Sequence, residues 1–269
     1  MQLKRILFLY IFISHAFFGA CALARTSSGF VVEEKGFTPH YLANDSAEDI
    51  KIASPENITI IVYSHGTTRS SRTEDCDADW NKVPKSLLSL SSDQVKIYYL
   101  CSNASDNDGV FGGYVYKRAK EITQVVNELI KQGVDSRRIF LSGHSAGAWS
   151  SLMSRVNSTT EVGGLILFAP AFGGRKNLEL TQPVWRQTLR PKQASEIVTA
   201  QTIRAIIFSY FGDPFGEPDE ISFITKAFPT STEHISYSCF FGVSNPHLTH
   251  LNDCEQRKTS DRIVKFISK

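Results

Sequence analysis

Apolar residues occur along the chain in two kinds of spacing that alternate with each other. Continuous runs rich in β-branched residues, such as Ile58–Tyr63 and Val95–Leu100, are typical of strands buried on both faces. Between such runs, apolar residues from Val115 to Ile130 recur at helical spacing, and charged residues occupy the opposite face. Strands that alternate with helices predict an α/β fold, in which helices cover both faces of a mostly parallel central sheet.

The rest of the chain continues this alternation, with one exception. Strands are also expected at Phe30–Glu33, Ile50–Ile52, Gly164–Phe168, Ala205–Tyr210 and Ile235–Phe241, and helices at Trp80–Leu90 and Asp261–Ile267. The exception is the segment Arg175–Arg204, which holds six basic and two acidic residues, could form two short helices and has no strand pattern. We expect a single domain over residues 25–269, with a small insertion at about residues 175–204.

The first 24 residues resemble a secretory signal peptide. Lys4 and Arg5 precede an apolar run from Ile6 to Phe18, and small residues ending at Ala24 follow it. The run is shorter than the roughly 20 apolar residues of a membrane-spanning helix, so we expect the segment to be cleaved after export, leaving no stable membrane span. Cys21 lies in a sequence that resembles a lipoprotein cleavage site, so lipid anchoring through Cys21 is the alternative to a free periplasmic or secreted protein.

The charge balance argues against a nucleic-acid partner. The whole chain has 29 basic and 27 acidic side chains, and removal of residues 1–24 takes away two basic side chains, Lys4 and Arg5, which leaves 27 of each kind. Proteins that bind nucleic acids normally have an excess of positive charge. We expect no nucleic-acid partner, and separately we expect a small-molecule substrate and a monomeric protein.

The cysteines fit an exported protein. Once the first 24 residues are removed, four cysteines remain, an even number that favours disulfides in an oxidising compartment. Proximity in the sequence favours the pairs Cys76–Cys101 and Cys239–Cys254, while the other pairings and free thiols stay open. The sequence contains no Cys-x-x-Cys motif and no His/Cys spacing typical of a metal site, so we expect no metal.

The candidate chemistry is concentrated in Ile139–Gly147. There a short apolar run leads into Gly-His-Ser-Ala-Gly, and a helical segment follows from Ala148. A serine at a sharp turn between strand and helix presents its hydroxyl outward, and the flanking glycines avoid collisions of Cβ atoms. The helix that follows directs backbone N–H groups towards a developing oxyanion. Ser145 is therefore the predicted nucleophile, although a plain Ser/Gly-rich turn would have the same composition.

Three motifs in order along the chain resemble the α/β-hydrolase family. Ser64-His65-Gly66-Thr67 follows an early strand, the serine motif follows a middle strand, and Gly212-Asp213-Pro214 follows a late strand, with histidines near the end of the chain. Nucleophile, acid and histidine occur in this order in that family. The small insertion makes the chain most similar to compact esterases and dienelactone-hydrolase-like enzymes. The chain lacks the Gly-Gly run that follows His-Gly in many lipases and esterases.

The resemblance implies a catalytic acid and an oxyanion hole. Asp213 is the best-placed acid because it follows the strand Ala205–Tyr210 by three residues, whereas the next carboxylates lie further along. Its alternative role is to form a turn before Pro214. The backbone N–H groups of Thr67 and Ala146 are the expected oxyanion donors. No organic cofactor is expected.

The catalytic base is chosen among three late histidines. His234 is predicted at the start of the final strand, away from the carboxyl ends of the strands. His247 and His250 both follow that strand. We prefer His247, because members of the family usually place this histidine early in the loop and because Pro246 restricts its approach. His250 remains the alternative base.

These features predict an exported serine hydrolase that cleaves a small-molecule ester through an acyl-enzyme intermediate. Amidase or peptidase activity on the same residues is one alternative, and a non-catalytic binding protein that retains the fold is another. We expect a preference for short acyl groups, because an insertion of about 30 residues is too small to build a deep lipid-binding cap.

Overall fold

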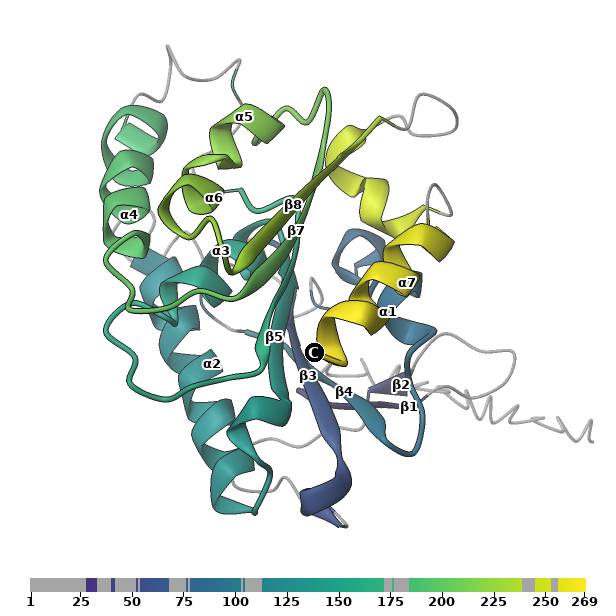
Figure 1. Cartoon of the computed structure of the whole chain (residues 1–269). Helices are drawn as coiled ribbons and strands as arrows, with labels where there is room; N and C mark the ends of the chain where they lie inside the picture. Colours follow the sequence, from purple (N-terminus) through teal and green to yellow (C-terminus); the bar gives the residue numbers. More distant parts are fainter. Residues whose placement is uncertain are drawn as a thin grey trace, which may run out of the picture.

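The computed structural model describes residues 28–32, 40–41, 52, 54–67, 76, 78–102, 104, 113–171, 176, 184–238, 245–252 and 256–269. In this part of the chain, eight strands form a sheet in the order β2-β1-β4-β3-β5-β6-β7-β8 (Figure 1). The strands are β1 (Gly29–Val32), β2 (His40–Tyr41), β3 (Thr59–Ser64), β4 (Val95–Leu100), β5 (Ile139–His144), β6 (Gly164–Phe168), β7 (Ala205–Tyr210) and β8 (Thr232–Tyr237). Strands β3 to β8 pair in parallel, whereas β1 is antiparallel to β2 and β4.

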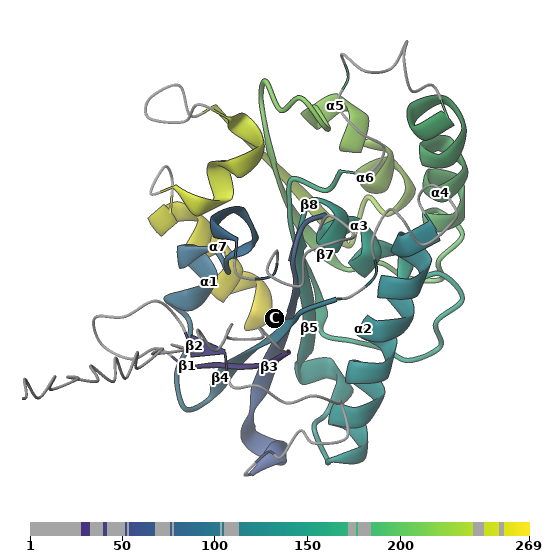
Figure 2. The same ribbon diagram turned by 180° about the vertical axis from the view of Figure 1, so that it is seen from behind.

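Helices cover both faces of the sheet (Figures 1 and 2). On one face lie α2 (Gly113–Lys131), α3 (Ala146–Met153), α4 (Arg190–Ile197), α5 (Pro218–Ile221) and α6 (Phe223–Ala227), and on the other lie α1 (Lys85–Leu88) and α7 (Gln256–Ile267). Each face has its own apolar cluster, one containing Trp149 of α3 and the other Phe266 of α7. The predicted α/β fold, in a single domain, is confirmed.

The parallel register brings several strand ends to one edge of the sheet. Ser64 of β3 pairs with Gly143 of β5, and His144 at the end of β5 pairs with Phe168 of β6, which in turn pairs with Phe208 of β7. The residues that follow these strands therefore leave the sheet at the same carboxyl edge. In α/β folds this is the edge where ligands bind.

The helix predicted at Trp80–Leu90 is wrong in its first half. Trp80 lies in a short 3-10 helix, η4 (Asp79–Asn81), and only Lys85–Leu88 forms an α-helix. Pro84 separates the two because a proline has no N–H to donate and fits only before or at the start of a helix.

Two boundaries near the end of the chain also differ from the prediction. The last strand covers Thr232–Tyr237 and begins three residues before the predicted Ile235, because its pairing with β7 begins where Thr232 meets Ala205. Residues 239–241 of the predicted strand lie outside the described residues. His234 therefore lies within the strand and not at its start. The last helix begins at Gln256, earlier than the predicted Asp261. The expected insertion contains a π-helical segment, η7 (Val184–Leu189), that continues into α4.

Cys76 and Cys101 form the disulfide favoured by their proximity in the sequence, with Cα atoms 5.7 Å apart. Closing a loop of this length stabilises a fold by about 3 kcal/mol. The second expected pair, Cys239–Cys254, lies outside the described residues, as do residues 1–24, Cys21 and most of the strand expected at Ile50–Ile52. Within the described part of the chain, no helix is both long and apolar enough to cross a membrane.

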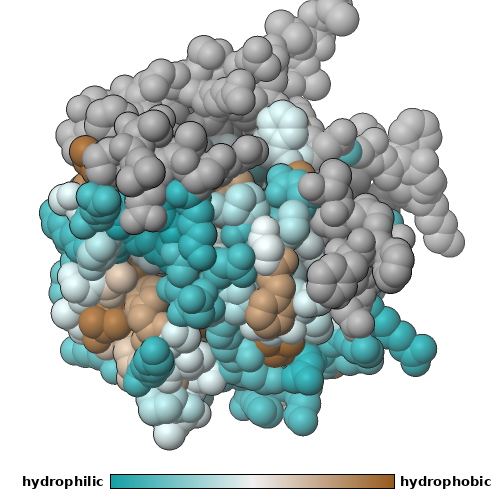
Figure 3. Space-filling view, turned by 90° about the horizontal axis from the view of Figure 1, so that it is seen from above, coloured by the Kyte–Doolittle hydropathy of each residue, from teal (hydrophilic) through white to brown (hydrophobic). Residues whose placement is uncertain are grey.

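Where the view from above is coloured, teal and white residues separate the brown, apolar ones into several patches (Figure 3). The large apolar side chains exposed in the described residues are Trp80, Val184, Val198, Phe211 and Val264. Single exposed apolar side chains of this kind are common on protein surfaces and indicate no particular partner.

Candidate active site

Ser145 lies at the turn between β5 and α3 in a strained conformation, with φ of 54° and ψ of −121°. Such strain costs about 1–3 kcal/mol and is often found at active sites. Two glycines permit the turn: a Cβ atom on Gly147 would lie 2.0 Å from the carbonyl oxygen of Ser64, and one on Gly143 would lie 2.6 Å from backbone. The N–H of Ser145 donates to the carbonyl oxygen of Phe168 at 3.0 Å. The serine is thus held at the carboxyl edge of the sheet.

Asp213 and His247 are in direct contact, although 34 positions separate them. The Nδ1 of His247 donates to Oδ2 of Asp213 at 2.8 Å. Asp213 is 1% exposed, and its Oδ1 accepts the N–H of Phe215 at 2.8 Å. His247 belongs to the 3-10 helix η8 (Pro246–Leu251), which the side chain of Asn245 caps. A carboxylate on Nδ1 fixes the imidazole tautomer and leaves the lone pair on Nε2, where a base needs it.

His144 connects the turn of Ser145 to η8. Its Nε2 donates to the backbone carbonyl of His247 at 2.9 Å, and the centroids of the two rings are 4.6 Å apart. Burial, with smaller effects from His250 and His247, lowers the pKa of His144 well below its ordinary 6.5. The ring is therefore neutral around pH 7. Since Ser145 is the next residue, the predicted nucleophile, acid and base all belong to one edge of the sheet.

His250, the alternative base, lies behind His144. Its ring stacks on that of His144 with centroids 3.7 Å apart and an interplanar angle of 21°. Its ring nitrogens are buried and make no hydrogen bond to a described side chain. Burial, followed by the charge of His247, lowers the pKa of His250. The structure thus brings Asp213 to His247 and not to His250.

The two expected oxyanion donors come from different segments, the start of α3 and the loop after β3. Ala146 is buried and is the first residue of α3. Thr67 is exposed in the loop after β3, and its hydroxyl is 3.3 Å from that of Tyr114 on α2.

Arg118 of α2 holds the loop that contains Thr67, a role that the sequence reasoning missed. Its buried guanidinium donates to the carbonyl oxygens of His65 at 2.7 Å, Gly66 at 2.9 Å and Ala104 at 3.2 Å. One signal was available in the sequence: Arg118 falls three positions after Val115, on the apolar face of α2.

His65 is a structural histidine next to the disulfide. Its Nδ1–H donates to the carbonyl oxygen of Gly66 at 2.7 Å, because its Nε2 accepts the N–H of Ser102 at 2.9 Å. Burial and the charge of Arg118 lower its pKa well below 6.5. Its Nε2 lies 3.6 Å from Sγ of Cys76. His65, Cys76 and Cys101 carry atoms that can bind metals and lie within 4.8 Å of one another, but the disulfide occupies both sulfurs.

Buried arginines of the insertion contact residues 214–220, the segment that follows the predicted acid Asp213 and that we call the acid loop. Arg186 and Arg190 both donate to the carboxylate of Glu220, the latter at 3.1 Å. Arg186 also donates to the carbonyl oxygen of Phe215 at 3.2 Å, and the ring of Phe215 lies 4.4 Å from that of His247. The basic excess of the insertion is therefore directed in part at the loop that follows Asp213.

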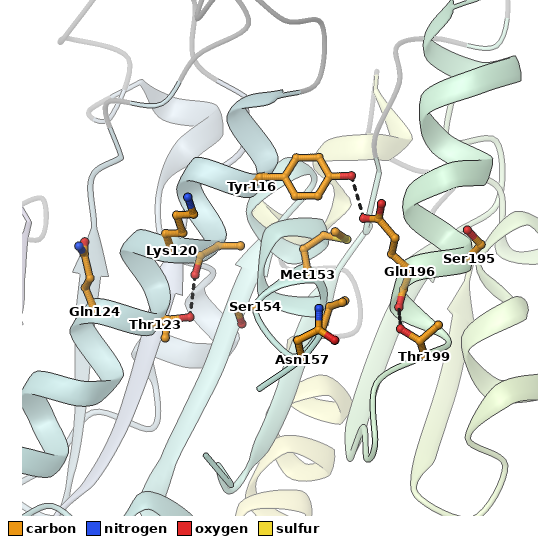
Figure 4. Close-up of a pocket in the computed structure, with 12 residues that line it drawn as sticks. Tyr116, Lys120, Thr123, Gln124, Met153, Ser154, Asn157, Ser195, Glu196 and Thr199 are labelled. Carbon is orange, nitrogen blue, oxygen red and sulfur yellow. Dashed lines mark hydrogen bonds between the residues drawn. The ribbon is translucent and has the colours of Figure 1, made fainter. Parts of the chain in front are cut away.

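A separate groove of about 760 Å³ runs between α2, the end of α3 and α4 (Figure 4). The hydroxyl of Tyr116 donates across it to Glu196 at 2.7 Å, and burial together with this carboxylate raises the pKa of Tyr116 to about 12. Met153 and Asn157 lie between the two sides of the groove (Figure 4). Its described lining contains none of the predicted catalytic residues.

A mostly parallel sheet with a strained serine between a strand and a helix defines the α/β-hydrolase class. A family model described as phospholipase/carboxylesterase matches residues 104–182. A search of curated proteins finds no match. The family match covers less than a third of the chain, and together with the shared fold it supports an α/β-hydrolase fold of the kind found in serine hydrolases.

Several solved structures share this fold at low sequence identity. A puromycin-hydrolyzing peptidase of Mycobacterium tuberculosis has 11% identity and a TM-score of 0.54, over 82% of this chain and 36% of the peptidase. The DcsB complex with its substrate analogue has 13% identity and a TM-score of 0.54, over 80% and 91% of the two chains. Esterase 2 of Thermogutta terrifontis, phosphorylated by paraoxon, has 15% identity and a TM-score of 0.51, over 81% and 84%. The chain thus spans about a third of the mycobacterial peptidase, and these likenesses concern the fold.

Proposed function

We propose that the protein hydrolyses a carboxylic ester, with Ser145 as nucleophile, His247 as base and Asp213 as the acid that orients it. The observation that carries the proposal is the 2.8 Å hydrogen bond between His247 and Asp213 at the edge where Ser145 lies in a strained turn. This combination activates a serine, which by itself is a weak nucleophile.

The reaction proceeds in two halves. The Oγ of Ser145 attacks the ester carbonyl carbon while His247 Nε2 takes its proton, and the carbonyl oxygen becomes an oxyanion bound by the N–H groups of Ala146 and Thr67. The protonated His247, stabilised by Asp213, then gives the proton to the leaving alcohol, and an acyl-enzyme remains on Ser145. In the second half, water attacks the acyl carbon while His247 takes a proton from the water. The bond between the acyl group and Ser145 then breaks, the acid product leaves, and His247 returns the proton to Ser145.

The substrate class, the export and the oligomeric state are proposed from the sequence and from the similar proteins. The matched family model, described as phospholipase/carboxylesterase, favours an ester over an amide, while a peptidase among the proteins of similar fold keeps amide hydrolysis as the second candidate. We propose export with removal of residues 1–24, anchoring at Cys21 being the alternative, and a monomer that acts on esters with short acyl groups.

A fluorophosphonate probe tests the proposal, because it forms a covalent adduct only with an activated serine. We expect one adduct, on the peptide that contains Ser145, and none in Ser145→Ala. Ser195→Ala, which changes an exposed serine of α4, is the matched control and should be labelled like the wild type. Failure of the folded wild type to react would favour a non-catalytic binding protein.

A panel of p-nitrophenyl esters and the matching anilides tests the substrate class. We expect acetyl and butyryl esters to be cleaved faster than long-chain esters, and esters faster than anilides. Faster cleavage of long-chain esters would contradict the short-acyl preference. Faster cleavage of anilides would favour the amidase alternative.

A further inference from the structure

A small pocket of about 160 Å³ lies at the edge of the sheet opposite the predicted catalytic residues. It is lined at the start of β6 by Gly164, which lies close to Ala205, the first residue of β7, through the parallel pairing of the two strands. The catalytic candidates follow the carboxyl ends of the strands, and β6 extends for five residues, or about 16 Å. The pocket is therefore separate from the site of ester hydrolysis.

Arg155 enters this pocket from the turn after α3. It is 8% exposed, and one of its N–H groups donates to the carbonyl oxygen of Thr160. Among the described residues, no carboxylate lies within ion-pair distance of its guanidinium. Desolvation lowers its pKa, but an arginine stays charged at neutral pH. A buried cation without an anion is costly, so the site favours a negatively charged group.

Arg204 lines the same pocket from the segment before β7. It donates to the carbonyl oxygens of Gly163 and Phe266, and its guanidinium lies 4.1 Å from the centroid of the Phe266 ring. These contacts fix its orientation and use two of its five N–H groups. It too lacks a carboxylate partner within the described part of the chain. The pocket thus presents two guanidinium groups with unused donors, the group best suited to oxyanions.

The acidic side chain that also lines the pocket does not neutralise these arginines. Glu161 is exposed, and its charge acts on Arg137, whose pKa it helps to raise after the larger effect of Asp135. None of the ion pairs between described residues joins Glu161 to Arg155 or Arg204. Its negative charge near the pocket opposes an entering anion and keeps the expected affinity low.

We propose that this pocket binds a small oxyanion of the phosphate class, which bridges Arg155 and Arg204. The hydroxyl of Thr202, which also lines the pocket, is a third polar group within the lining. Such an anion would join the end of α3 to the start of β7 and, through Phe266, to α7 on the other face of the sheet. Its binding stabilises the folded protein and leaves the catalytic edge untouched, so it is independent of the proposed ester hydrolysis.

Titration with inorganic phosphate at constant ionic strength, with chloride as the balancing salt, tests this proposal. We expect saturable binding at one site, with a Kd on the order of 1 mM and a rise in Tm of about 3 °C at ten times that concentration. Esterase activity should not change. The absence of any phosphate effect beyond that of chloride would overturn the proposal.

Four variants locate the site. Arg155→Gln should weaken phosphate binding at least tenfold, and Arg204→Lys should do so while retaining the charge, which keeps the test usable if Arg155→Gln does not fold. Glu161→Gln should tighten binding several-fold. Arg262→Gln, which changes an exposed arginine paired with Glu233, is the matched control and should bind phosphate like the wild type. If phosphate binds only after Glu161→Gln, Glu161 itself fills the pocket, and the proposal is wrong for the natural protein.

Discussion

Three buried histidines lie together at the carboxyl edge, and His247 is the one that contacts an acid. His247→Ala removes the predicted base and the partner of Asp213, so we expect kcat to fall by at least about a thousandfold. His250→Ala removes only a ring that stacks on His144, and we expect a much smaller loss. Ester hydrolysis by both variants is compared after circular dichroism has confirmed folding. The reverse order would assign the base to His250.

His144 is expected to act as a positioning residue for His247. His144→Phe keeps a ring that can stack on His250 but loses the N–H that donates to the carbonyl oxygen of His247. A hydrogen bond of about 1 kcal/mol that holds the base in place corresponds to a loss in kcat of about fivefold to tenfold. His144→Gln, which retains an N–H donor, should recover part of this loss.

The measurement for His144 is the separate determination of kcat and KM for a short-chain ester. Active sites are counted by titration with the fluorophosphonate probe. A positioning role lowers kcat per active site and leaves KM nearly unchanged, whereas general destabilisation lowers the number of active sites and leaves kcat per active site unchanged. Equal kcat values for His144→Phe and the wild type would contradict the assigned role.

At the scale of elements, the sequence predicted the helices and strands whose position depends on their own apolar pattern. The apolar spacing of α2 and the β-branched runs of β3 and β4 identified those elements, because each buries a continuous face. The start of β8 could not be predicted, because its pairing with β7 decides it. The motif of Ser145 was recognisable because sharp turns need small residues at fixed positions, but its catalytic role and those of Asp213 and His247 remain predictions.

Contacts between distant segments account for what the sequence did not reveal. Arg118 of α2 donates hydrogen bonds to the loop that contains Thr67. Arg186 and Arg190 of the insertion form ion pairs with Glu220. Nothing in the spacing of these residues indicates which charges meet. The basic excess of the insertion therefore did not indicate these contacts with Glu220.

Glu220→Gln tests the link between the insertion and the acid loop. It replaces the carboxylate that Arg186 and Arg190 share by a neutral amide, although their side chains are only 5% and 9% exposed and both stay charged. Removing one partner of a buried ion pair costs about 3 kcal/mol, and we expect a loss of this order in the free energy of unfolding. Because Arg186 also contacts Phe215, which lies against His247, kcat should fall as well.

Urea unfolding and ester hydrolysis measure the two effects of Glu220→Gln. Asp219→Asn changes the neighbouring carboxylate, which acts on Arg190 through its charge but makes no ion pair with it, and as the control it should lose much less stability than Glu220→Gln. A variant with reduced stability but unchanged kcat would show that the insertion does not position the acid loop.

At the scale of the whole molecule, the order of motifs along the chain was informative because the parallel sheet converts it into proximity. Ser64, Ser145 and Asp213 lie at or just after the ends of three different strands, and the register brings those ends to one edge. The disulfide followed from proximity in the sequence, since 25 positions separate its cysteines. No sequence motif indicated the pocket that we propose to bind phosphate. Arg155 and Arg204 are distant in the sequence, and they line one pocket because β6 pairs with β7.

The buried histidines should make the whole fold sensitive to acid. Burial lowers the pKa values of His65, His144 and His250 well below 6.5, while in the unfolded chain each titrates near that value. Below pH 6.5 the unfolded state therefore binds protons that the folded state does not, so stability is full above this pH and falls as the pH decreases. Each histidine contributes up to about 1.4 kcal/mol per pH unit, or about 4 kcal/mol for three.

Urea unfolding between pH 7.5 and pH 5 measures this acid sensitivity. We expect the free energy of unfolding to decrease steadily below about pH 6.5, with a slope that approaches three protons bound per molecule unfolded. His250→Phe keeps a stacking ring and removes one of the titrating groups, so its slope should be smaller by up to one proton. A wild-type stability that is constant from pH 7.5 to pH 5 would mean that these histidines are protonated in the folded protein, and the neutral stack of His144 and His250 beside the predicted base would be wrong.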